Sequence, residues 1–87
     1  MMDYAQLNFE IAGCLRKAGC REIYLLAVKG FSYTLAVSGS KSASDYEALL
    51  LKHFPERQFE VLLMDETMDY EEKDEILAYG IPLYRGE

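Results

Sequence analysis

The chain has 87 residues, of which 51% are hydrophobic and 28% charged, and its formal net charge is −6. This length and composition predict one folded domain over residues 1–87. The acidic balance argues against a nucleic-acid-binding protein, because affinity for the phosphate backbone rests mainly on lysine and arginine. No apolar stretch approaches the roughly 20 residues that span a bilayer, and the N-terminus lacks the features of a signal peptide. We therefore expect a cytoplasmic protein that binds neither nucleic acid nor membranes.

Apolar residues recur every three or four positions over residues 3–18, which predicts an amphipathic helix. Asp3 is the candidate cap at its start. Gly19 suits the position after the last turn, where a left-handed backbone costs glycine nothing. The first helix should therefore end at Gly19.

Residues 23–28 and 31–37 are predicted strands that meet at Lys29-Gly30, where a two-residue break with glycine predicts a tight hairpin. The first run is continuously apolar, as in a strand that is covered on both faces. The second run alternates a bulky face with a small, partly polar face that carries Ser32 and Thr34. This small face is a candidate position for chemistry.

A second helix is predicted from Ser44, which with Glu47 matches a capping box, to about Phe54, where Pro55 follows. A third strand is expected over residues 59–64. A third helix over residues 70–79 should follow, with Asp65 and Thr67 or Asp69 at its start and Gly80 at its end. Residues 81–84 contain Pro82, so they can form only an edge strand or a packed extended segment.

This order of elements predicts a small α/β (α+β) domain with a mixed three-stranded sheet. The first two strands should pair antiparallel, and the second and third should be parallel because a helix connects them. The helices are expected mainly on one face of the sheet.

The sequence resembles the minimal nucleotidyltransferases, small members of the DNA polymerase beta-like nucleotidyltransferase superfamily. The resemblance covers nearly the whole chain and rests on four segments: GCREIYL at residues 19–25, TLAV at 34–37, EVLLMD at 60–65 and EILAYGIPLY at 75–84. The last segment is the most similar to the family. The resemblance implies a nucleotidyltransferase-like fold.

The resemblance also implies where a catalytic site would lie. In this family a Gly-Ser loop after the first strand holds the triphosphate, and two aspartates one residue apart on the second strand bind two magnesium ions together with a third carboxylate. Here Lys29-Gly30 replaces the loop, Ser32 and Thr34 occupy the aspartate positions, and only Glu60 matches a carboxylate. Hydroxyls are weak magnesium ligands, so we expect no catalytic residues, no metal and no cofactor.

Our first hypothesis is therefore a catalytically inactive binding or regulatory module. It would act as a homodimer or homo-oligomer, or with a helical partner protein of the HEPN type, because such proteins are often encoded beside members of the family. The alternative is an active magnesium-dependent enzyme that transfers AMP from ATP, with Glu60 joined by Asp45, Glu47 or Asp65. A third possibility is a small-ligand-binding domain with a pocket over Ser32 and Thr34.

Gly39-Ser40 followed by Asp45-Tyr46-Glu47 contains the ingredients of the family motif out of place. We interpret Asp45 and Glu47 as helix-capping residues rather than metal ligands. Cys14 and Cys20 are interpreted as reduced packing residues, and His53 as a residue that favours a helix end. Residues 65–75 gather seven carboxylates with one lysine, which predicts a solvated helix face or, alternatively, a docking surface for a basic partner.

Overall fold

The computed structural model describes residues 4–65 and 68–86. Their secondary structure runs α1 (Tyr4–Lys17), β1 (Glu22–Lys29), β2 (Ser32–Ser38), α2 (Ala43–His53), β3 (Gln58–Leu63), α3 (Tyr70–Tyr79) and β4 (Ile81–Arg85). The strands form one mixed sheet in the order β3-β2-β1-β4, in which β2 and β3 are parallel and β1 pairs antiparallel with both β2 and β4. The predicted mixed α/β architecture is confirmed. The strand count is corrected from three to four, because the apolar segment after α3 pairs with the edge of β1.

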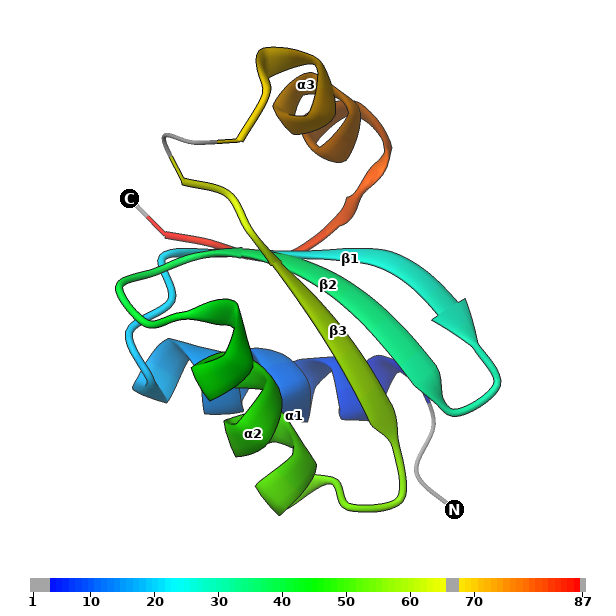
Figure 1. Cartoon of the computed structure of the whole chain (residues 1–87). Helices are drawn as coiled ribbons and strands as arrows, with labels where there is room; N and C mark the ends of the chain where they lie inside the picture. The colour runs from blue at the N-terminus through cyan, green and yellow to red at the C-terminus, as the bar shows by residue number, and fades with distance from the viewer. Residues whose placement is uncertain (1–3, 66–67, 87) are drawn as a thin grey trace.

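The helices lie on both faces of the sheet (Figure 1). α1 and α2 cover one face, and the larger core lies beneath them; its fully buried members include Ile11, Leu15, Leu35, Val37, Tyr46 and Leu50. α3 lies on the opposite face over a smaller cluster of Tyr24, Ala36, Met64 and Ile76. The expectation that helices lie mainly on one face thus holds for two of the three helices in the described part of the chain.

Gly19 ends α1 as predicted, and its backbone has a φ of 98°. The N–H of Cys20 donates to the carbonyl of Leu15 and the N–H of Gly19 to that of Arg16, both at 3.0 Å. These two bonds form a Schellman motif, in which the left-handed residue has to be glycine-like. Asp3, the expected cap at the other end, lies outside the described residues.

The hairpin turn lies one residue later than predicted. Lys29 pairs with Ser32, so the two turn residues are Gly30 and Phe31, and Gly30 has a φ of 61°. A positive φ at the first turn position is what a type II′ hairpin needs. Further along β1, the register shifts between Leu25 and Ala27 and leaves Leu26 as a bulge.

Only the first half of β1 is covered on both faces. Its residues from Ile23 to Leu25 are buried, whereas Ala27, Val28 and Lys29 are exposed. Ala27 and Lys29 pair with Thr34 and Ser32 on the α3 side of the sheet, and they are exposed because this 10-residue helix does not extend to the hairpin end (Figure 1). Val28 pairs with Tyr33 on the opposite face, away from α3. The prediction of a strand covered on both faces over residues 23–28 is therefore wrong for residues 27 and 28.

The predicted capping box of Ser44 and Glu47 is also wrong. Ser42 caps α2, since its hydroxyl accepts a hydrogen bond from the N–H of Asp45 at 3.1 Å. The carboxylate of Glu47 instead accepts the N–H of Val61 at 3.0 Å. Because β3 is an edge strand, this bond satisfies a backbone donor that no neighbouring strand can reach.

The ends of α3 differ in detail from the expectation. Asp69 precedes the helix but makes no side-chain capping bond, and Thr67 lies outside the described residues. Gly80 follows the helix with a φ of −69°, so it does not supply a left-handed cap. A Cβ on Gly80 would lie 2.6 Å from the carbonyl oxygen of Ile76 and 3.3 Å from the Cβ of Tyr24. Close packing against the last turn of α3 and against β1 is therefore the reason for glycine here.

Candidate functional site

The structure brings Ser32, Thr34 and Glu60 together on one face of the sheet. In the parallel pair of β2 and β3, Ser32 lies opposite Gln58 and Thr34 opposite Glu60. Side chains two residues apart on a strand share a face, so these four residues lie on the same side as Ala36, which packs beneath α3. We call this strip of Ser32, Thr34, Gln58 and Glu60 the open sheet face, because it lies outside the cluster that α3 covers.

The open sheet face carries three uncharged polar side chains and one carboxylate. The hydroxyl of Ser32 donates to the side-chain oxygen of Gln58 at 3.1 Å. Thr34 is half-buried, and Glu60 is exposed. A single exposed carboxylate beside two hydroxyls is a weak ligand set for magnesium, which prefers several carboxylate oxygens and phosphates. These residues are suited to hydrogen bonding and to attracting one positive charge.

The carboxylates of the alternative enzyme site come from α2, from β3 and from the segment that follows β3. Glu60 lies on the α3 side of the sheet, whereas α2, which carries Asp45 and Glu47, packs on the other side. Glu47 is also occupied by the N–H of Val61. Within residues 4–65 and 68–86, no group of three or more histidine, cysteine, aspartate or glutamate side chains is placed to hold a metal ion.

The loop at Gly39-Ser40 has a structural role that the sequence did not indicate. It wraps around the hydroxyl of the fully buried Tyr46, which accepts the N–H of Lys41 at 3.1 Å. Gly39 lies directly against this hydroxyl, so a Cβ there would clash with it. The loop is therefore held by Tyr46.

Neither cysteine has the environment of a nucleophile. Burial raises the pKa of the Cys20 thiol, which lies in the main core, and it also raises the pKa of the half-buried Cys14. A raised pKa lowers the thiolate population and hence the reactivity. His53 is the last residue of α2, is exposed, and has its ring 6.5 Å from that of Phe54.

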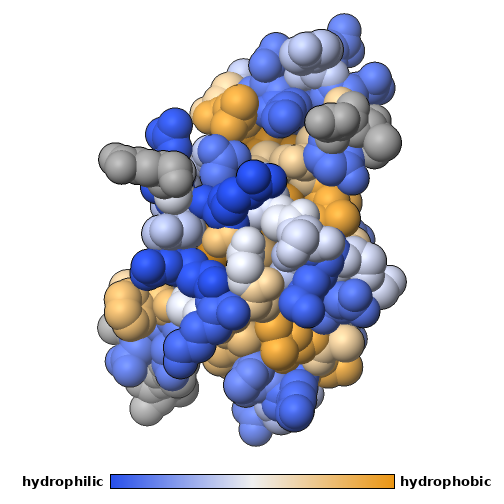
Figure 2. All heavy atoms as spheres, turned by 90° about the vertical axis from the view of Figure 1, so that its left-hand side faces the viewer, coloured by the Kyte–Doolittle hydropathy of each residue, from blue (hydrophilic) through white to orange (hydrophobic). Residues whose placement is uncertain are grey.

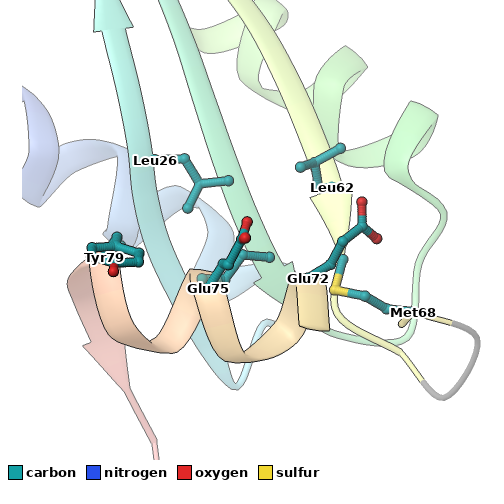
Figure 3. A pocket seen from close by; sticks show the side chains of 8 residues that line it. Leu26, Leu62, Met68, Glu72, Glu75 and Tyr79 are labelled. Atoms are coloured by element: carbon teal, nitrogen blue, oxygen red, sulfur yellow. The ribbon is translucent and has the colours of Figure 1, made fainter. Parts of the chain in front are cut away.

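A groove beneath α3 is the feature that the sequence reasoning missed. It has a volume of about 300 Å³, and its lining consists of Leu26 and Leu62 from the sheet, Met68 before α3, and Glu72, Glu75, Ile76, Tyr79 and Gly80. We call it the α3 groove. Figure 3 shows Glu72 and Glu75 extending from α3 with their carboxylates toward the level of Leu26 and Leu62.

Part of the α3 groove could have been found from sequence. Glu72, Glu75, Ile76 and Tyr79 recur at the spacing of one helix face, so a partly acidic face turned toward the sheet was detectable. The floor was not detectable, because Leu26 reaches it through a β-bulge that no sequence signal marked. The groove adjoins the open sheet face, since Leu62 lies two residues after Glu60 on the same side of β3.

Comparisons of this chain with protein-family models, with curated proteins and with solved structures gave no match. No helix in the described part of the chain is long and apolar enough to cross a membrane. The resemblance to the minimal nucleotidyltransferases therefore stays a prediction from the sequence.

Proposed function

We propose that this chain is a catalytically inactive nucleotidyltransferase-like domain that works as a binding or regulatory module. The observation that carries the proposal is the composition of the open sheet face, where Ser32 and Thr34 stand beside Glu60 at the positions that the resemblance assigns to metal binding. Ser32 is moreover hydrogen-bonded to Gln58. The two-residue turn before β2 leaves no segment for a triphosphate-binding loop between β1 and β2.

The surface of the molecule supports a binding role. Large apolar side chains are exposed on several elements; those more than half exposed include Tyr4, Phe9, Phe31, Tyr70, Tyr79 and Ile81. In Figure 2, apolar surface shows between hydrophilic residues both in the part that contains α3 and in the part that contains α1 and α2. Exposed aromatic residues are common where a small domain contacts another protein.

Neither edge strand of the sheet is suited to pairing with a strand of a partner, so a partner is expected to contact the faces of the molecule. At one edge, Glu47 already satisfies the N–H of Val61. At the other edge, β4 contains Pro82 and pairs with β1 through a register shift between Ile23 and Tyr24. Proline and bulges discourage the addition of another strand. A second copy or a helical partner of the HEPN type would therefore contact the helices or the open sheet face.

The catalytic part of the proposal is tested with Mg-ATP. Isothermal titration calorimetry of the wild-type chain should show no heat of binding, and labelled ATP should leave no AMP on the protein or on added protein substrates. Transfer of AMP by the wild-type chain would overturn the proposal, whatever residues were responsible.

A gain-of-ligand variant tests the position of the degenerate site. The double variant Ser32→Asp/Thr34→Asp places two carboxylates on the same face as Glu60, so it should bind Mn²⁺ in calorimetry where the wild type does not. Ser40→Asp/Ser44→Asp adds the same charge at two exposed positions away from the open sheet face and should not bind Mn²⁺. Equal binding by both double variants would mean that Ser32 and Thr34 do not mark a former metal site.

A further inference from the structure

The α3 groove has an apolar floor that remains accessible from outside. Leu62 is 38% exposed and Leu26 is half-buried, although both belong to the sheet. Tyr79 stands at one end of the groove and is 84% exposed. An accessible apolar floor of this kind favours a partner that brings an apolar side chain to it.

The charge around this floor is negative. Glu72 and Glu75 line the groove and both are exposed. Their carboxylates therefore stay solvated and place negative charge beside the apolar floor. Glu60 adds a third carboxylate on the same side of β3 as Leu62, about 7 Å along the strand, since each residue of a strand advances about 3.3 Å. An apolar residue is thus flanked along the sheet by acidic side chains, which complement a partner with basic residues on both sides of an apolar one.

We propose that the α3 groove and the adjoining open sheet face bind an extended segment of a partner protein in which every second residue faces the groove and these residues are in turn basic and apolar. This inference deepens the proposed function as a binding module and rests on it. The apolar side chain of the segment contacts Leu26 and Leu62, and its lysine or arginine residues pair with the groove carboxylates and with Glu60. Ser32 and Gln58 offer hydrogen-bonding groups farther along the same face.

The open form of the groove favours a protein segment over a small organic cation. Pockets for small ligands enclose most of the ligand surface. Here the lining includes side chains as exposed as Tyr79, and the polar strip continues beyond the groove, so a longer segment gains contacts that a small cation does not reach. Acidic partners and nucleic acid are disfavoured, because their charge repels the same carboxylates.

The probe for this inference is a fluorescein-labelled peptide in which lysine, serine, leucine and serine repeat. In an extended peptide its lysine and leucine residues lie on one side and its serine residues on the other. Fluorescence anisotropy with the full chain should show binding that weakens as salt is added. Peptides with glutamate in place of lysine, or with serine in place of leucine, should bind at least about tenfold more weakly, because they lose the ion pairs or the apolar contact.

A matched pair of variants separates local contacts from overall charge. Glu72→Gln/Glu75→Gln removes two charges from the groove, and Glu71→Gln/Asp74→Asn removes two charges from the outer face of the same helix. We expect the first variant to lose about tenfold in affinity and the second no more than about twofold, since only the first removes carboxylates that line the groove. Circular dichroism checks that both variants fold.

Amide chemical shifts in nuclear magnetic resonance spectra locate the bound peptide independently. Shifts of Leu26, Leu62 and the α3 residues would support the inference. Equal weakening by the two double variants would overturn it, and so would shifts centred on the separate groove between α1 and α2, which Phe9, Lys17 and His53 help to line. Either of these results would leave the binding module in place, whereas AMP transfer by the wild-type chain would remove the proposed function without touching the peptide result.

Discussion

Three buried tyrosines provide a direct test of how this domain is held together. Tyr24, Tyr33 and Tyr46 are at most 2% exposed. The hydroxyl of Tyr46 accepts the N–H of Lys41 at 3.1 Å. The hydroxyls of Tyr24 and Tyr33 have no hydrogen-bond partner among residues 4–65 and 68–86. Replacing each tyrosine by phenylalanine removes one oxygen atom and leaves the ring in place.

The expected effects differ in sign. Tyr46→Phe leaves the backbone N–H of Lys41 without its partner, which costs about 1–3 kcal/mol of the free energy of unfolding. Tyr24→Phe and Tyr33→Phe remove a buried hydroxyl that gains nothing from the fold, so the stability should stay the same or rise by about 1 kcal/mol. For a domain of this size, a loss of 2 kcal/mol lowers the urea midpoint by about 1–2 M.

Urea unfolding followed by circular dichroism measures all three variants under the same conditions. A second readout is hydrogen exchange of the Lys41 amide, which should speed up in Tyr46→Phe because its acceptor is gone. If the three variants lose equal stability, or if Tyr46→Phe is as stable as the wild type, the assignment of Tyr46 as the residue that holds the Gly39-Ser40 loop is wrong.

Three further predictions concern edge strand β3, the glycines at positions 13 and 80, and the dependence of stability on pH. Glu47→Ala should lower stability by about 1–2 kcal/mol and promote self-association in sedimentation velocity, because it uncovers a backbone donor of edge strand β3; unchanged sedimentation would contradict this role. Gly80→Ala should destabilise, since its Cβ would lie 2.6 Å from a carbonyl oxygen, whereas Gly13→Ala, with open space around it inside α1, should raise the melting temperature; equal effects would refute the packing argument. Burial raises the pKa values of Cys20 and Tyr46, so folding favours the protonated form of both groups. The stability of the fold is therefore unaffected by their ionisation below about pH 9 and falls as the pH rises through their folded-state pKa values. Urea midpoints that stay constant in alkaline buffer would disprove this prediction.

Local signals predicted most of the elements. The helix that ends at Gly19 and the hairpin glycine at position 30 follow from backbone conformations that only glycine adopts easily, so the sequence shows them directly. The capping of α2 was misread because both Ser42 and Ser44 precede an acidic residue by three positions. The side chain of Glu47 bonds to β3 instead of the helix start, a contact between residues 14 positions apart that no local signal indicates.

The candidate site could be predicted only in part. The alternation of β2 correctly placed Ser32 and Thr34 on one face, because the strand period of two is a local property. The pairing of Thr34 with Glu60 follows the predicted parallel arrangement of β2 and β3. The α3 groove could not be predicted from the sequence. It forms because Leu26 is a bulge residue and because a short helix covers only part of the sheet.

The path of the chain through α3 couples the two edges of the sheet. β3 forms one edge and β4 the other, and α3 is the connection that crosses from the first to the second. A force on this helix therefore reaches β1 through β4, whose ladder joins residue 81 to residue 25. Loss of β4 from this ladder would leave β2 as the one strand beside β1 in the described part of the chain and expose the backbone hydrogen-bonding groups that β4 now pairs.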